Sequence, residues 1–101
     1  MPFSVRYKPA AAAEVENAIG WYGRPEINQG TAFVLELERT EAHLASHPEL
    51  YQRVEGEIRR AVLRRFPYSL FYVIEIDLVL VLTCMHHHQK PRSRGDLLGS
   101  Q

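Results

Sequence analysis

Two apolar segments separated by a short polar turn constrain the fold of this chain more than any other feature. Residues 68–74 and 78–85 are rich in β-branched, aromatic and aliphatic side chains, which favour β-strands. The polar residues at 75–77 between them predict a tight hairpin. Because almost every position is apolar, both strands are expected to lie inside a sheet with both faces covered.

The residues before this hairpin predict one short strand and a first helix. Apolar and polar residues alternate over residues 3–8, which is the pattern of a half-buried strand. Pro9 ends that strand and suits the first turn of a helix. From residue 10 to about residue 24, apolar side chains recur every three or four positions, so we expect an amphipathic helix. At its end, Trp21 and Tyr22 are expected to pack against the core.

A second amphipathic helix is expected from residues 28–31 to about Ser46, and Pro48 closes it. The expected apolar face consists of Phe33, Leu37, Thr40 and Leu44, and the expected polar face includes Glu36, Arg39 and His43. Each helix has a single apolar stripe, so the two form a hairpin that needs a further layer to cover it.

The second half of the chain supplies this layer as a sheet. Residues 57–66 mix apolar residues with four arginines, which predicts a strand with one wet, basic face. The order strand, helix, helix and three-strand meander predicts an α+β fold, in which a helical hairpin packs on a mostly antiparallel sheet. The N-terminal strand is expected to pair beside the last strand, with Arg6 and Lys8 close to the four arginines.

Length and composition limit the class of protein. A chain of 101 residues has room for one domain, which we place at residues 1–88, followed by a mobile tail at 89–101. The 46% hydrophobic and 24% charged residues are typical of a globular protein. No signal peptide or membrane-spanning run is present, so a cytoplasmic location is expected. Cys84 is the only cysteine, and its apolar surroundings predict a buried, unreactive thiol.

Basic residues gather in the second half of the chain, although the formal net charge is zero. The basic cluster consists of Arg59, Arg60, Arg64 and Arg65, with Lys90 further along the chain. Two interpretations are open. The arginines are either a solvated strand face paired with glutamates of the helices, or a patch that binds phosphates or an acidic partner.

Three consecutive histidines, His86 to His88, follow the last strand. If the strand stays extended, Cys84, His86 and His88 point to one face about 7 Å apart, close enough for neighbouring imidazoles to share an ion. No second cluster of ligands completes such a site, so we expect neither a metal nor a cofactor. The histidines are either tolerated at an exposed strand end or form the rim of a functional surface, where imidazole titrates near neutrality.

Nearly the whole sequence resembles a known family of proteins. The run I-R-R-A-V-L-R-R-F-P-Y-S-L-F-Y at 58–72, V-L-V-L-T-C-M-H at 79–86 and Pro91 are similar to the RelE/ParE superfamily of bacterial toxins, and so are W-Y at 21–22 and H-P-E-L-Y at 47–51. The resemblance implies a single toxin domain with a helical hairpin on an antiparallel sheet. It also implies a hetero-oligomer with a cognate antitoxin, which neutralises the growth arrest that the toxin causes.

The resemblance leaves two targets open. RelE-like members cut mRNA in the ribosome, for which Glu57, Arg60, Arg64 and His87 are the catalytic candidates here. One ribonuclease branch ends its last strand with Cys-Arg-Tyr-His-Tyr, from which this chain departs at Met85 and His88.

ParE-like members poison DNA gyrase and are not enzymes in the usual sense. Phe66-Pro67-Tyr68 with His86 and Pro91 is more similar to the arrangement in ParE-like and uncharacterised plasmid-stabilisation members. We therefore expect a gyrase-directed toxin. Its target-binding residues would be Arg59, Arg60, Arg64, Arg65, His86, His88 and Lys90. A degenerate member that only binds its antitoxin is a further alternative.

Overall fold

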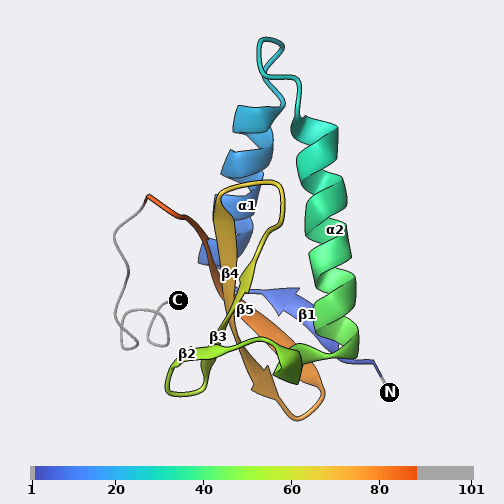
Figure 1. The fold of residues 1–101 in the computed structure, drawn as a ribbon, viewed down its shortest axis with the longest axis vertical. Helices are drawn as coiled ribbons and strands as arrows, with labels where there is room; N and C mark the ends of the chain where they lie inside the picture. The colour runs from blue at the N-terminus through green and yellow to red at the C-terminus, as the bar shows by residue number, and fades with distance from the viewer. Residues whose placement is uncertain (1, 89–101) are drawn as a thin grey trace.

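The structure is a five-stranded sheet with two helices packed on one of its faces (Figure 1). It is a computed structural model that describes residues 2–88. The elements follow in the order β1 (Ser4–Tyr7), α1 (Pro9–Tyr22), α2 (Gly30–Ser46), the 3-10 turn η1 (Pro48–Leu50), β2 (Arg53–Glu55), β3 (Ile58–Val62), β4 (Tyr68–Glu75) and β5 (Leu78–His86). This arrangement confirms the predicted α+β fold.

The strands lie in the order β1-β5-β4-β3-β2. The predicted hairpin is β4 and β5, which pair antiparallel from Tyr68 opposite His86 to Glu75 opposite Leu78. β1 pairs with β5, as the sequence predicted, and the two strands run parallel. The remaining pairs are antiparallel. Both apolar strands are therefore internal to the sheet, and a bulge in β5 leaves Leu82 without a partner opposite β4.

The sequence did not predict β2. This strand has only three residues, all of them exposed, so it carries no alternation of buried and exposed side chains. Gly56 follows it with a φ of 55°, which is a left-handed conformation that glycine adopts without strain. The expected strand at 57–66 is shorter than predicted, because β3 ends at Val62 and residues 63–67 form the β3–β4 loop.

The helices begin and end near the predicted signals. Pro9 occupies the first turn of α1, and Gly23 caps its end by donating its backbone N–H to the carbonyl of Ile19 at 2.8 Å. Tyr22 packs on the core as predicted, but the same prediction for Trp21 was wrong. Its side chain is 49% exposed, and the guanidinium of Arg24 lies 4.2 Å from its ring centroid.

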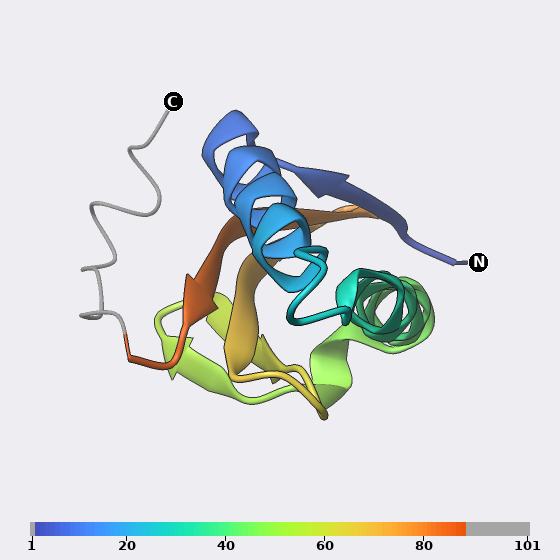
Figure 2. The same cartoon turned by 90° about the horizontal axis from the view of Figure 1, so that it is seen from above.

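The core lies between the helices and the sheet (Figure 2). Where α1 ends and α2 begins, Tyr22 stacks on Phe33 with ring centroids 5.2 Å apart, and both rings meet Phe66 edge-on. Phe66 belongs to the β3–β4 loop, so this aromatic cluster holds the loop against α1 and α2.

The opposite face of the sheet departs from the prediction that both faces are covered. Within residues 2–88, both long helices pack on one face. On the other face, Ile58, Val73 and Leu82 bury one another, and Phe71 and Leu80 are partly exposed. These apolar residues form a small second cluster in place of a full layer.

Arg6 and Lys8 do not lie beside the basic cluster, as the sequence led us to expect. The pairing of β1 with β5 was right, but β5 and β4 separate β1 from β3. Three strand spacings correspond to roughly 14 Å. The two residues therefore lie at the opposite edge of the sheet from Arg59 and Arg60.

Candidate functional site

The four arginines of the basic cluster point to different parts of the molecule. Arg60 lies on β3 opposite Phe71, on the face of the sheet that carries no helix. Arg65 is exposed in the β3–β4 loop, with its guanidinium carbon 5.9 Å from the ring centroid of Phe66. Arg59 and Arg64 turn toward the helical side, so the cluster is not one continuous patch.

Arg59 stabilises the segment that follows α2. Its Nη1 donates hydrogen bonds to the carbonyls of Glu49 at 3.0 Å and Tyr51 at 2.6 Å. The buried hydroxyl of Tyr72 donates to the carbonyl of Pro48 at 2.6 Å, and burial raises the pKa of this phenol well above its usual range. The 48–51 segment is thus fixed to β3 and β4, and the Tyr51 side chain is held next to α2.

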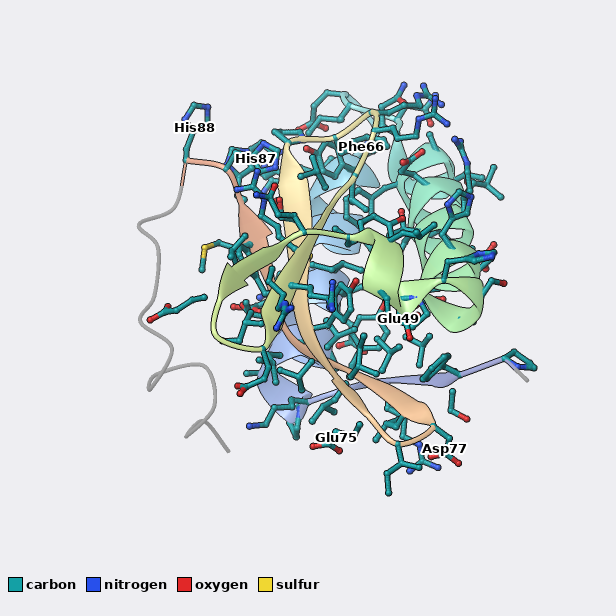
Figure 3. The ribbon with its side chains drawn as sticks, turned by 60° about the horizontal axis from the view of Figure 1, so that its bottom comes forward. Glu49, Phe66, Glu75, Asp77, His87 and His88 are labelled. Atoms are coloured by element: carbon teal, nitrogen blue, oxygen red, sulfur yellow. The ribbon has the colours of Figure 1, made fainter. Side chains whose placement is uncertain are left out.

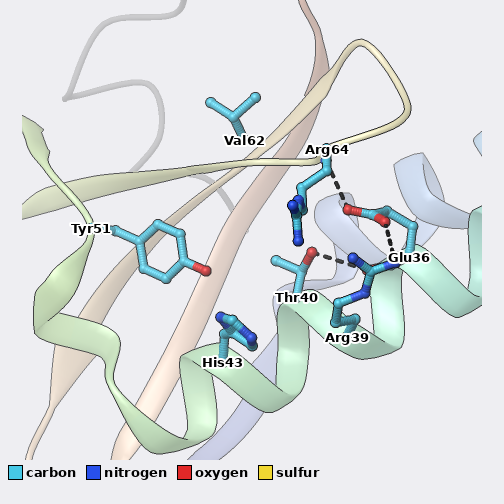
Figure 4. A pocket seen from close by; sticks show the side chains of 7 residues that line it. All are labelled: Glu36, Arg39, Thr40, His43, Tyr51, Val62 and Arg64. Carbon is cyan, nitrogen blue, oxygen red and sulfur yellow. Dashed lines mark hydrogen bonds and ion pairs between the residues drawn. The ribbon is translucent and has the colours of Figure 1, made fainter.

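Arg64 lies at a small pocket between α2 and the β3–β4 loop (Figure 4). Its backbone N–H donates a hydrogen bond to Oε2 of Glu36 at 2.7 Å. The guanidinium takes no part in this hydrogen bond and is directed toward α2. The pocket holds about 40 Å³ and is lined by Glu36, Arg39, Thr40, His43, Tyr51, Val62 and Arg64. We call it the Arg64 pocket.

Glu36 is the main correction to the predicted helix faces. The sequence placed it on the polar face of α2, but its side chain is only 1% exposed. Besides accepting the hydrogen bond from Arg64, it forms an ion pair with Nη2 of Arg39 through Oε1 at 3.1 Å. A buried carboxylate needs such partners, and one of them is a backbone N–H 28 residues away that periodicity does not reveal.

Glu14 has a comparable role on α1. β1 pairs with β5 only as far as Tyr7 and Val81. Beyond that point, Oε1 of Glu14 accepts hydrogen bonds from the backbone N–H of Cys84 at 2.9 Å and from the hydroxyl of Thr83 at 2.6 Å. The carboxylate thereby satisfies buried donors of β5 where the neighbouring strand has ended. The prediction of a buried thiol is confirmed, since burial, and then Glu14, raise the pKa of Cys84 to about 12.

The three histidines leave the sheet beside the β3–β4 loop. The backbone N–H of His87 donates to the carbonyl of Pro67 at 2.8 Å, and Nε2 of its ring lies 3.0 Å from Oγ of the buried Ser69. The rings of His86 and His88 stack with centroids 5.1 Å apart, and His86 meets Tyr68 edge-on. Burial, and then the neighbouring imidazoles of His88 and His87, lower the pKa of His86.

The two ends of the sheet carry different polar side chains (Figure 3). His87 and His88 lie at one end, on the side of Phe66, and the backbone N–H of His87 joins this end to Pro67 of the β3–β4 loop. Glu75 and Asp77 lie at the opposite end, at the turn between β4 and β5. A negatively charged target would meet the histidine end with less repulsion than the acidic turn.

The catalytic candidates for a nuclease are not all brought together. Glu57 lies in the turn before β3, whereas His87 follows β5 at the other end of the sheet. The strand register places them on the order of 20 Å apart along and across the strands. A base and an acid that act on one scissile phosphate must both reach it within hydrogen-bond distance. Lys90 lies outside the described residues.

Two further features concern metals and membranes. Among residues 2–88, no group of three or more His, Cys, Asp or Glu side chains is arranged to hold a metal ion. In the same part of the chain, neither helix has the length and apolar character needed to cross a bilayer.

Comparison with known proteins gives the family. The sequence model described as the ParE toxin of the type II toxin–antitoxin system parDE matches residues 5–91. The chain belongs to the ParE toxin family. The resemblance to the RelE/ParE superfamily is thereby confirmed, and the protein is the toxin of a type II toxin–antitoxin system. No curated protein matches the toxin in the sequence comparison.

Solved structures agree with this assignment. A chain from the chromosomal ParDE toxin–antitoxin system of P. aeruginosa superposes with a TM-score of 0.69 at 15% sequence identity, covering 83% of the toxin and 95% of that chain. A chain from the toxin–antitoxin complex RelBE2 of Mycobacterium tuberculosis superposes with a TM-score of 0.60 at 20% identity, covering 85% of the toxin and 92% of that chain. At these identities the likeness shows a shared fold.

Proposed function

We propose that this toxin arrests growth by binding and inhibiting DNA gyrase, and that a cognate antitoxin neutralises it by forming a complex with it. The match to the ParE toxin family over residues 5–91 carries this proposal. The similar structures belong to toxin–antitoxin systems, which supports an antitoxin as the partner.

The positions of the candidate catalytic residues favour inhibition by binding over RNA cleavage. Metal-independent cleavage of RNA requires a base for the 2′-hydroxyl and an acid for the leaving 5′-oxygen at the same phosphate. Glu57 and His87 lie at opposite ends of the sheet, so they do not supply that pair. A surface that binds a protein target has no such requirement, because its charges can act over a wide area.

The target-binding surface that we propose lies at the histidine end of the sheet. It combines His86, His87 and His88 with Arg65 of the β3–β4 loop and extends to Arg60 on the helix-free face. Arg60 lies beside the partly exposed Phe71, so a cation and an aromatic side chain are available together. Such pairs are common at protein interfaces.

Pulse labelling distinguishes the two targets. The toxin is induced without antitoxin, and incorporation of labelled thymidine and labelled methionine is followed over the first minutes. We expect thymidine incorporation to fall first. Purified gyrase should then lose supercoiling activity when the toxin is added. An early fall in methionine incorporation with cleaved mRNA would support the RelE-like alternative, and growth without arrest would indicate a member that only binds its antitoxin.

Paired variants test the proposed surface. Arg60→Ala combined with Arg65→Ala should relieve growth arrest at equal expression, because both cations are removed from the target-binding surface. Arg6→Ala is the matched control, since Arg6 is exposed at the opposite edge of the sheet. Full toxicity of the double variant, with the fold unchanged by circular dichroism, would contradict the proposed surface.

A further inference from the structure

The Arg64 pocket has the net charge of a site for a single anion. Glu36 contributes one negative charge, and Arg39 and Arg64 contribute two positive charges. The charges of Glu36 and Arg39 cancel, because the two side chains form an ion pair at 3.1 Å. The positive charge of the Arg64 guanidinium is left over. Within residues 2–88, this guanidinium forms no ion pair.

Neighbouring groups hold the walls of the pocket in place. Glu36 binds the Arg64 backbone, and the hydroxyl of Thr40 donates to the carbonyl of Glu36 at 3.0 Å. Arg59 fixes the segment that carries Tyr51. These contacts fix the Arg64 backbone and the pocket walls, so only the Arg64 side chain has to be ordered when a ligand binds.

Exposed aliphatic side chains line this charged pocket and the hollow beside it. Val62, which lines it, is 42% exposed, and Leu50 is 80% exposed. Leu50 belongs to an adjoining hollow of about 190 Å³ that shares His43 and Tyr51 with the Arg64 pocket. The two hollows meet at His43 and Tyr51 beside the C-terminal half of α2, and we call them together the groove.

We propose that this groove binds a segment of the antitoxin, with an Asp or Glu carboxylate paired with Arg64 and a neighbouring aliphatic side chain packed on Leu50 or Val62. The inference rests on neutralisation by an antitoxin, which is part of the function proposed above, and it names the chemistry of that contact. The Arg64 pocket is small enough to suit a carboxylate and leaves the adjoining hollow for the apolar neighbour.

The apolar rim favours a peptide over a nucleic acid. A phosphodiester backbone would pair with Arg64 but would present charge to Leu50 and Val62. The buried carboxylate of Glu36, which faces the same pocket, would also repel a chain of closely spaced phosphates. A peptide offers one carboxylate followed by an apolar side chain, which matches both parts of the groove.

The substitution Arg64→Gln tests the contact directly. The hydrogen bond to Glu36 uses the backbone of residue 64, so the loop keeps this anchor in the variant. The cognate antitoxin is the probe, and its dissociation constant is measured by calorimetry with purified full-length toxin. We expect Arg64→Gln to weaken binding by about tenfold or more. Arg53→Gln, an exposed arginine outside the groove, should change it less than threefold.

A double-mutant cycle identifies the matching carboxylate. Each antitoxin Asp or Glu is changed to its amide and measured against wild-type toxin and Arg64→Gln. We expect one acidic residue whose replacement weakens binding at least fivefold against wild type and less than twofold against the variant.

Three results would overturn the proposal. The first is equal antitoxin affinity for wild type and Arg64→Gln. The second is that Arg64→Gln binds a single-stranded RNA more weakly than wild type while its antitoxin affinity is unchanged. That result would make the groove a binding site for a nucleic-acid phosphate. The third is the absence of antitoxin binding to wild type, which would also remove the neutralisation proposed above. The first two leave that neutralisation intact, so the two failures are distinguishable.

Discussion

Replacing Glu36 by Ala should destabilise the toxin strongly, although the residue occupies a position that the sequence placed on the polar face of a helix. The hydrogen bond from the Arg64 backbone to the carboxylate, at 2.7 Å, contributes about 2 kcal/mol. The ion pair with the half-exposed Arg39 adds at most about 1 kcal/mol after screening by solvent. Loss of the buried Cγ methylene adds about 0.8 kcal/mol, and the higher helix propensity of Ala returns about 0.5 kcal/mol.

The expected loss is therefore about 3 kcal/mol in the free energy of unfolding. It is measured by urea denaturation followed by far-UV circular dichroism, on protein separated from its antitoxin and refolded. With a denaturant slope of about 1.5 kcal/mol/M, the midpoint should fall by about 2 M. Glu36→Gln keeps an acceptor for the Arg64 N–H and should lose about 1 kcal/mol.

Glu38→Ala is the matched control, because Glu38 is exposed on the same helix. It should change the free energy of unfolding by no more than about 0.5 kcal/mol. If Glu36→Ala and Glu38→Ala had the same midpoint, the anchoring of the β3–β4 loop by Glu36 would be refuted.

Three further predictions follow from buried or perturbed groups. Glu14→Ala should lower the free energy of unfolding by about 2–4 kcal/mol, because the Thr83 hydroxyl and a backbone N–H lose their acceptor, whereas the exposed Glu16→Ala should have little effect in the same urea titration. The Cys84 thiol, with its pKa raised to about 12, should react with a disulfide reagent only after unfolding; rapid reaction of native protein would contradict its burial. His86 should titrate by NMR below the usual imidazole pKa. Because its folded pKa is lower than its unfolded pKa, the unfolded state binds the proton more readily, so this residue favours unfolding as the pH falls below about 6.5.

The charged residues show where reasoning from the sequence reaches its limit. Arg59, Arg60, Arg64 and Arg65 are close in the sequence, so they were expected on one basic face. Alternation along β3 sends Arg59 and Arg60 to opposite faces, and the turn that follows directs Arg64 toward α2. Proximity in the chain therefore did not make one binding surface. The strand period of two could have predicted this for Arg59 and Arg60, because it places neighbouring strand residues on opposite faces of the sheet.

The sequence by itself determined the order of the elements other than η1 and β2, the helical hairpin and the internal β4–β5 hairpin. These depend on hydrophobic periodicity, on proline and glycine signals and on turn residues, all of which act over a few positions. The tertiary structure alone decided that Glu36 and Glu14 point inward. The partners of these carboxylates lie 28 and about 70 residues away, and a buried charge is stabilised by whichever donors the fold brings to it. For the same reason, the Arg64 pocket exists only once α2, β3 and the segment after α2 have packed together.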